Sequence, residues 1–284
     1  MELRKAERRQ AKIKLGLQGP SGSGKTYSAL LLAFGLVEDW SKIAVIDSEQ
    51  HSSDLYAHLG SFNVLHLEEP FSPERYVEAI EICENAGMQA IIVDSISHEW
   101  DGAGGILDTH GNMMGNSFTN WSKITPRHNA FVNKILQSNS HILATIRAKQ
   151  DYVLSEKNGK QVPEKIGLKG VTRDGMDYEF TLVFELDLKH NATSTKDRTG
   201  LFMDKPQFIV SSETGRQIKE WCNKGTSLDE LLKEIKSCQT VEGLRVIWRQ
   251  YPEFRLVIEP TLLKRKDALV NAESNVISEQ IQPL

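Results

Sequence analysis

Residues 19–26, with the sequence GPSGSGKT, constrain the fold of this chain more than any other feature. They lie between a short strand pattern at residues 13–17 and an apolar helix pattern at residues 27–37. Glycines at such positions let backbone N–H groups close around phosphate oxygens, and the N-terminus of the following helix adds positive potential at the same point. The run therefore predicts a Walker A phosphate-binding loop between a strand and a helix.

We expect this loop to bind ATP together with Mg²⁺. Lys25 would reach the β and γ phosphates, and Thr26 would ligate the magnesium ion. A second magnesium-binding residue is predicted at Asp94, because residues 91–94 (IIVD) form an apolar strand pattern that ends in an acid, the Walker B arrangement. The predicted nucleotide-binding residues are Gly19, Pro20, Ser21, Gly22, Ser23, Gly24, Lys25, Thr26 and Tyr27.

The acid that activates the attacking water is predicted at Glu49. Ser95 follows Asp94, at a position where many phosphate-loop ATPases carry a catalytic glutamate. Glu49 comes just after the strand pattern of residues 42–47, which we expect to lie beside the phosphate-loop strand. From there its carboxylate would polarise a water for in-line attack on the γ phosphate. A surface acid in a turn is the alternative interpretation.

Strand and helix patterns alternate up to about residue 146, which predicts a doubly wound α/β fold with a mostly parallel, twisted sheet flanked by helices. Strands are expected at residues 42–47, 63–67, 89–94, 141–146, 178–188 and 200–210, and helices at 72–87 and 125–137. Residues 148–176 interrupt the alternation with glycines and lysines, and we expect a long, mobile loop or hairpin there. Three further helix patterns follow residue 227. The predicted domains are a basic arm (1–10), an ATPase core (11–224), a small helical domain (225–272) and a flexible tail (273–284).

Composition narrows the class of protein. The 284 residues are 39% hydrophobic, which is ordinary for a globular chain, and the longest apolar run, residues 29–37, is much shorter than the ~20 residues that span a bilayer. We therefore expect a cytoplasmic protein that does not contact a membrane. The three cysteines are widely spaced and predict neither disulfides nor a zinc site. The net charge of −4 argues against indiscriminate coating of nucleic acid.

The chain resembles the RecA-type recombinase ATPases, and more closely the phage-associated AAA-type ATP-binding proteins that share a RecA-like core with phage single-strand annealing ATPases. The resemblance spans about residues 11–215 and is carried by the phosphate loop and by residues 45–49, 91–95 and 193–200. It implies a RecA-like P-loop NTPase core in a phage or prophage protein. It also implies self-association into a ring or filament.

The resemblance suggests further site residues. In RecA-like filaments, two basic residues one apart reach across the subunit interface to the γ phosphate of the neighbour, and Lys196 and Arg198 match that spacing, with a solvated turn as the alternative. Tyr56 occupies a place where the family can stack adenine, although a core or surface tyrosine is an equal alternative. Arg147 stands where the family carries a polar sensor, but it departs from the usual amide.

Two segments correspond to the loops with which RecA-like cores grip single-stranded DNA. Residues 98–121 contain Trp100, Phe118 and Trp121, aromatic side chains that stack on bases without reading sequence. Residues 148–176 carry six lysines and arginines against four acids, a net charge of +2, and are expected to track phosphates. A lid over the nucleotide and a solvated hairpin are the respective alternatives.

Together these expectations predict a Mg²⁺-dependent, DNA-stimulated ATPase that binds single-stranded DNA and promotes phage recombination, by annealing or strand exchange, as an oligomer. Two other functions stay open: a hexameric helicase or translocase motor, and an ATP-gated scaffold that recruits replication or recombination proteins through its helical domain. The histidines show no metal-binding spacing and are interpreted as polar loop residues: His51, His98, His110 and His190.

Overall fold

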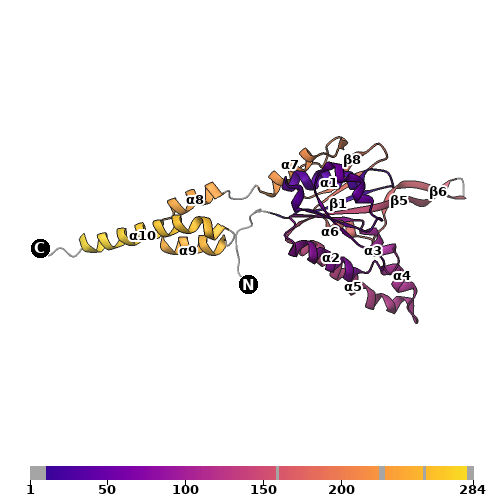
Figure 1. Cartoon of the computed structure of the whole chain (residues 1–284), viewed down its shortest axis with the longest axis horizontal. Coiled ribbons are helices and arrows are strands. Elements are labelled where there is room, and N and C mark those ends of the chain that lie inside the picture. The colour runs from indigo at the N-terminus through magenta and orange to yellow at the C-terminus, as the bar shows by residue number, and fades with distance from the viewer. Residues whose placement is uncertain (1–10, 158–159, 224–227, 252–253, 280–284) are drawn as a thin grey trace. The chain divides into compact units, whose positions relative to one another are not determined.

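The computed structural model describes residues 11–157, 160–223, 228–251 and 254–279 (Figure 1). The chain divides into two compact units, an α/β unit at Ala11–Cys222 and a helical unit from Asn223 onward. The predicted basic arm lies outside the described residues. Among the helices that the structure describes, none combines the length and the apolar character needed to cross a membrane.

One sheet forms the centre of the α/β unit, in the order β3-β2-β4-β5-β1-β7-β8-β9. The strands from β3 to β7 in this order are parallel, whereas β8 and β9 are antiparallel, and β6 pairs only with β5 as a hairpin. The predicted doubly wound α/β fold with a mostly parallel sheet is confirmed. The strands are β1 Lys14–Gly19, β2 Ile43–Asp47, β3 Asn63–His66, β4 Ala90–Asp94, β5 His141–Lys157, β6 Lys160–Gly170, β7 Leu182–Leu186, β8 Asn191–Asp197 and β9 Phe208–Ile209.

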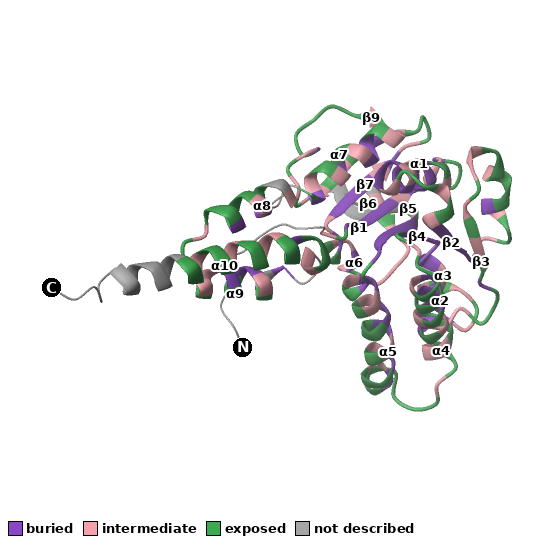
Figure 2. Cartoon of the chain, turned by 60° about the vertical axis from the view of Figure 1, so that its left-hand side comes forward, coloured by how far each residue is buried: buried purple, intermediate pink, exposed green. Residues whose placement is uncertain are grey.

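Helices cover both faces of the sheet, because its central strands are apolar on both sides (Figure 2). Neighbouring residues of one strand enter different cores: Val45 packs on the side of α1 and Ile46 on the side of α2. Helix α7 packs so closely on α1 that a Cβ on Gly35 would lie 2.0 Å from the carbonyl oxygen of Ser212. The helices are α1 Lys25–Val37, η1 Trp40–Lys42, η2 Ser52–Leu59, α2 Pro73–Asn85, α3 Ser97–Asp101, α4 Ile106–Gly111, α5 Ser117–Gln137, α6 Met176–Glu179 and α7 Ser212–Cys222.

The position predicted for β2, beside the phosphate-loop strand, was wrong. Strands β4 and β5 lie between β2 and β1. All five residues of β4 are buried, and β5 is buried from His141 to Ile146, which suits both strands to the middle of the sheet, whereas β3 is half exposed and lies at its edge.

Two segments differ from the sequence-based assignment, and in a third one of two alternatives holds. Residues 98–121, expected as a loop, fold mostly into α3, α4 and the first turns of α5. Residues 148–170, expected as a loop or hairpin, are mainly paired strand, because β5 continues past Ile146 and pairs with β6 as a hairpin. The strand expected from Tyr178 begins only at Leu182, because the short α6 precedes it.

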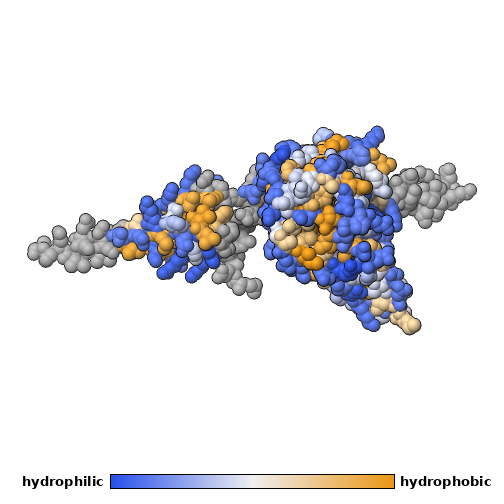
Figure 3. Space-filling model, viewed as in Figure 1, coloured by the Kyte–Doolittle hydropathy of each residue, from blue (hydrophilic) through white to orange (hydrophobic). Residues whose placement is uncertain are grey.

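The helical unit contains α8 Leu228–Ser237, α9 Val241–Gln250 and α10 Arg255–Glu279. Its core is built from Leu231, Ile235, Leu244, Ile247, Tyr251 and Ile258, which confirms that helices follow the α/β unit. Helix α10 continues to Glu279, within the segment predicted as a flexible tail from residue 273. Apolar side chains also gather on the surface of this unit (Figure 3), and Leu256 is 90% exposed.

Candidate functional site

The loop between β1 and α1 has the backbone that its glycines predict. Gly22 and Gly24 adopt positive φ angles of 80° and 84°, which L side chains rarely adopt. A Cβ on Gly19 would lie 2.6 Å from the carbonyl oxygen of Leu186, so the close approach of β7 requires glycine there. The hydroxyl of Ser23 is buried and lacks a hydrogen-bond partner among the described residues. The loop therefore offers a tightly curved backbone and one polar group that a bound phosphate would satisfy.

Lys25 holds its ammonium group over this loop. Its Nζ donates hydrogen bonds to the carbonyl oxygens of Gly19 at 3.0 Å and Pro20 at 2.9 Å. Burial lowers the pKa of Lys25, and the nearby carboxylates of Asp94 and Glu49 oppose that effect. The predicted phosphate-binding cation thus lies at the centre of the loop, close to both predicted acids.

Thr26 and Asp94 meet at the end of β4, as their proposed shared metal requires. The Thr26 hydroxyl donates to Oδ2 of Asp94 at 2.6 Å, and the Thr145 hydroxyl donates to the other carboxylate oxygen, Oδ1. Burial raises the pKa of Asp94, although both hydrogen bonds act to lower it. A hydroxyl and a carboxylate beside a phosphate loop form the oxygen donor set that suits Mg²⁺. Thr145 was missed, although a threonine within the apolar run of β5 was a visible signal.

Glu49 lies at the same edge of the sheet and is held from two sides. Its Oε1 accepts hydrogen bonds from Oγ of Ser95 at 2.9 Å and from Nε of Arg147 at 2.8 Å, and its Oε2 accepts from Nη2 of Arg147. Burial alone would raise the pKa of Glu49, but the hydrogen bonds from Arg147 and Ser95 and the charge of Arg147 lower it. The carboxylate is therefore kept ionised, in the state that accepts a proton.

These groups line one cavity of about 1050 Å³. Tyr27 and Tyr56 form one part of its wall, with ring centroids 5.9 Å apart. The turn after β7 contributes Lys189 and His190, and Nδ1 of His190 lies 3.1 Å from the carbonyl oxygen of Ser23. Sequence reasoning missed this pair, because only the order of the sheet shows that the turn lies beside the phosphate loop.

Lys196 and Arg198 do not join this cavity. Strand β8 runs antiparallel to β7, so both residues lie at the amino-terminal edge of the parallel strands, where the backbone N–H of Arg198 donates to the carbonyl oxygen of Thr181. Nζ of Lys196 donates to the carbonyl oxygens of Asp177 and Tyr178, and Nη2 of Arg198 donates to that of Tyr178 at 3.2 Å. Within one chain, therefore, they do not contact the phosphate loop.

A comparison with protein families matches residues 11–215 to the AAA domain family, AAA_24. The chain belongs to this family. AAA domains bind and hydrolyse nucleoside triphosphates, typically with Mg²⁺, and the match covers every residue of the cavity around Lys25. A comparison with curated proteins found no match.

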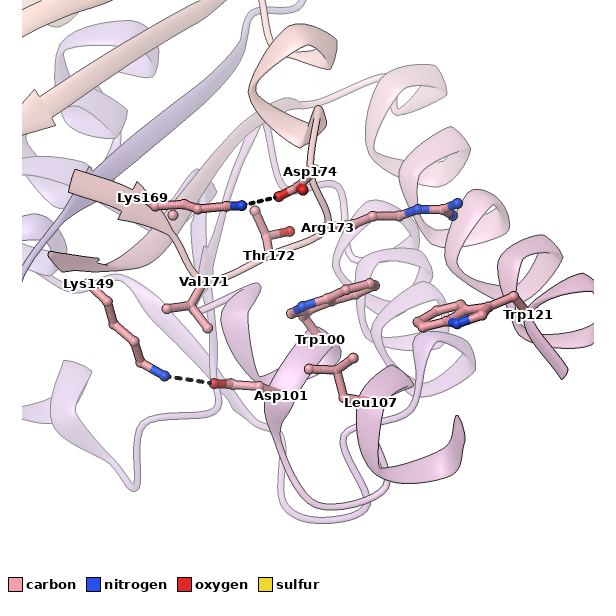
Figure 4. Close-up of a pocket in the computed structure, with 11 residues that line it drawn as sticks. Trp100, Asp101, Leu107, Trp121, Lys149, Lys169, Val171, Thr172, Arg173 and Asp174 are labelled. Atoms are coloured by element: carbon pink, nitrogen blue, oxygen red, sulfur yellow. Dashed lines mark ion pairs between the residues drawn. The ribbon is translucent and has the colours of Figure 1, made fainter. Parts of the chain in front are cut away.

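The AAA domain has a second cavity, of about 590 Å³, where the two predicted DNA-binding segments converge (Figure 4). Trp100 and Trp121 are stacked with centroids 6.0 Å apart at an interplanar angle of 22°. Lys149, Lys169 and Arg173 line the same cavity from β5, β6 and the segment after β6, and the two lysines point towards Asp101 and Asp174.

Two acids partly neutralise the positive charge of this cavity. Nζ of Lys149 lies 3.6 Å from Oδ2 of Asp101, and Nζ of Lys169 lies 2.8 Å from Oδ1 of Asp174. Phe118, the third predicted aromatic, is 87% exposed and does not line the cavity. The side chains of three other predicted cations lie outside the described residues: Lys157, Lys160 and Lys165.

Proposed function

We propose that this AAA domain protein is a Mg²⁺-dependent ATPase that binds single-stranded DNA and supports phage DNA recombination, by annealing or strand exchange, as an oligomer. The observation that carries the DNA-binding part is the cavity lined by two stacked tryptophans and by Lys149, Lys169 and Arg173. Aromatic ring faces can stack on bases of any sequence, and cations beside them can pair with the phosphates that link those bases.

For hydrolysis, the contacts at the edge of the sheet support the following roles. Lys25 and the backbone of the loop would hold the β and γ phosphates, and Thr26 and Asp94 would hold the magnesium ion. Bound Mg²⁺ would neutralise charge on the transferred phosphoryl group. Glu49 orients the attacking water and accepts its proton, with Ser95 positioning one carboxylate oxygen.

Strand β5 connects the two cavities and supports stimulation of the ATPase by DNA. Arg147 binds the catalytic carboxylate, and Lys149, two residues further along the same strand, lines both the nucleotide cavity and the tryptophan cavity. Residues two apart in a strand point to the same face. Binding of DNA to Lys149 would therefore also change the position of Arg147. Because Arg147 binds Glu49, the position of Glu49 would change with it.

The oligomeric part of the proposal concerns Lys196 and Arg198. At the amino-terminal edge of the sheet they could serve only the nucleotide of a neighbouring subunit, and they would have to exchange their contacts with the carbonyl oxygen of Tyr178 for that phosphate. Mixing Lys25→Ala subunits with Arg198→Ala subunits tests this role. Recovery of hydrolysis in the mixture supports cations supplied in trans, whereas inactivity of every mixture ratio contradicts it.

An ATP-gated scaffold is a second candidate, favoured by an apolar groove on the helical unit. The groove has a volume of about 370 Å³ and is lined by Leu244, Trp248, Leu262 and Leu263. Binding of replication proteins without any need for DNA would favour this function over recombination.

The DNA-binding proposal is tested by fluorescence anisotropy with a labelled oligothymidylate at several salt concentrations. Combined Lys149→Ala and Arg173→Ala changes are expected to weaken binding and to reduce its salt dependence, because they remove two phosphate contacts. Lys123→Ala, at an exposed position of α5, is the matched control. Unchanged affinity and salt slope in the double variant would refute the assignment of this cavity.

A further inference from the structure

Three potential metal ligands lie on and beside the loop that follows Glu49. Among the described residues, one group of histidine, cysteine or acidic side chains brings three ligand atoms within 4.8 Å of one another, and its members are His51, Asp54 and His66. The sequence did not predict this group, because His66 comes from a different strand. It is separate from the proposed magnesium site at Thr26 and Asp94.

The distances match those of a coordinated metal ion. Nδ1 of His51 lies 3.0 Å from Nε2 of His66, and Oδ2 of Asp54 lies 3.7 Å from each of these nitrogens. In a triangle with these sides, the point equidistant from the three atoms lies about 2.0 Å from each, close to the bond lengths of zinc to imidazole nitrogen and carboxylate oxygen. One ion could therefore contact all three atoms with small rotations of the side chains.

The backbone holds the ligands in place from independent elements. His66 is the last residue of β3 and pairs with Asp47 of β2. Asp47 in turn fixes the loop, since its Oδ1 accepts from the backbone N–H of Glu49 at 2.7 Å and its Oδ2 from that of Ser53 at 2.9 Å. Asp54 follows in the first turn of η2, one turn after His51. The three ligands thus come from a strand end and a loop that is fixed by a buried carboxylate.

The direct contacts within the chain do not join all three groups. The two imidazole nitrogens, 3.0 Å apart, can form one hydrogen bond with each other. At 3.7 Å the carboxylate oxygen is too far from either nitrogen for a good hydrogen bond. A divalent cation would bind both lone pairs and the carboxylate at once.

We propose that His51, Asp54 and His66 form a binding site for a late first-row divalent metal ion, with Zn²⁺ the best match. Two imidazoles and one carboxylate favour zinc over magnesium or calcium, which prefer oxygen ligands. All three side chains are accessible to solvent, at 58%, 54% and 34% exposure, so water would complete the coordination shell. Since Glu49 lies two residues before His51, a bound ion fixes the segment that carries the proposed catalytic carboxylate.

The test is calorimetric titration of Zn²⁺ into tag-free, chelator-treated full-length protein, in excess Mg²⁺ and without nucleotide or DNA. We expect one equivalent to bind the wild type, with affinity reduced at least 100-fold in His51→Ala and in His66→Ala. His58→Ala, an exposed histidine in η2, is the matched control and should retain binding. Titration in a Cys238→Ser background excludes a contribution from that partly exposed thiol.

Co²⁺ supplies a second measurement of metal binding, one that does not depend on the folding stability of the variants. Its visible absorption should appear on binding to wild type and be altered in Asp54→Asn, a variant that keeps the shape of the side chain. Equal Zn²⁺ binding by the wild type and a folded His51→Ala/His66→Ala double variant would overturn the proposal. Because the measurement uses neither ATP nor DNA, it succeeds or fails independently of the proposed function.

Discussion

The two edges of the parallel sheet use the same residue types for different purposes. At the carboxyl-terminal edge, charged groups contact one another around a cavity: Arg147 binds Glu49, and Lys25 lies close to both Glu49 and Asp94. At the amino-terminal edge, Nζ of Lys14 donates to the carbonyl oxygens of Ser138 at 2.8 Å and Ser140 at 2.7 Å.

The surroundings, rather than the residue type, therefore distinguish a site from a structural bond, because Lys25 and Lys14 both donate to backbone carbonyls but Lys25 lines a cavity and Lys14 is buried at the start of β1. Lys14 binds backbone carbonyls, and burial lowers its pKa to about 8. Nδ1 of His141 accepts a hydrogen bond from the backbone N–H of Ile13, and burial lowers the pKa of this histidine to about 3. Such groups satisfy the ends of strands and loops. The groups at the opposite edge leave polar atoms directed at a cavity, where a ligand can use them.

The largest expected effect is on turnover at the carboxyl-terminal edge. Glu49→Gln should lower the ATP hydrolysis rate by about 10²–10³-fold, because the amide cannot accept the proton from water. Nucleotide affinity, measured with a fluorescent ATP analogue, should change little. Glu78→Gln, an exposed acid on α2, is the control. Near-normal turnover in Glu49→Gln would contradict the role assigned to this carboxylate.

At the amino-terminal edge the same logic predicts a loss of stability without a loss of binding. Lys14→Met should lower the free energy of unfolding by about 1–3 kcal/mol, since the carbonyl oxygens of Ser138 and Ser140 lose their donor. Urea denaturation measures this change, and nucleotide affinity should stay the same. Weaker nucleotide binding at unchanged stability would contradict the purely structural role assigned to Lys14.

Because His141 is buried, we expect it to make the free energy of unfolding depend on pH. Its folded pKa of about 3 lies below the ordinary value for histidine, so the unfolded chain binds the proton more readily. Its contribution to stability is complete above about pH 6.5 and falls by up to about 1.4 kcal/mol per pH unit as the pH drops towards 3. His141→Gln should flatten this part of the stability profile. An identical slope in the variant would contradict burial as the cause.

Replacement of Arg147 is expected to have a smaller effect, on the pH dependence of the ATP hydrolysis rate. Its charge and hydrogen bonds keep the pKa of Glu49 low against the effect of burial. In Arg147→Gln the burial effect is no longer offset, so the acid limb of the turnover profile should move to higher pH. Steady-state hydrolysis between pH 5 and 8 measures it, and an unmoved acid limb would show that Arg147 does not set the state of Glu49.

Structural features that depend on a short stretch of sequence could be predicted. Features that depend on how strands are arranged in the sheet could not. The phosphate loop and the end of β4 placed Lys25, Thr26 and Asp94 correctly, because each follows a local pattern. The contact between Glu49 and Arg147 joins residues 98 positions apart and depends on the order of the sheet. His51 and His66 are only 15 positions apart, but their contact depends on the pairing of β3 with β2.

The start of α5 shows a different kind of failure. A helix was expected from residue 125, yet α5 begins at Ser117 and continues through Pro126. Asn116 caps it, its side chain accepting from the backbone N–H of Phe118 at 2.8 Å and of Thr119 at 3.3 Å. Because of this cap, the segment that was predicted as a loop is helical. Trp121 therefore lies on a helix, at a fixed position beside Trp100.

The most direct test of the account is steady-state ATP hydrolysis with and without single-stranded DNA, for the wild type, Lys25→Ala and Lys149→Ala. We predict hydrolysis that DNA stimulates in the wild type, no hydrolysis in Lys25→Ala, and basal hydrolysis that DNA fails to stimulate in Lys149→Ala. Hydrolysis that persists in Lys25→Ala, or DNA stimulation that is unchanged in Lys149→Ala, would contradict a nucleotide site at the carboxyl-terminal edge linked through β5 to the tryptophan cavity.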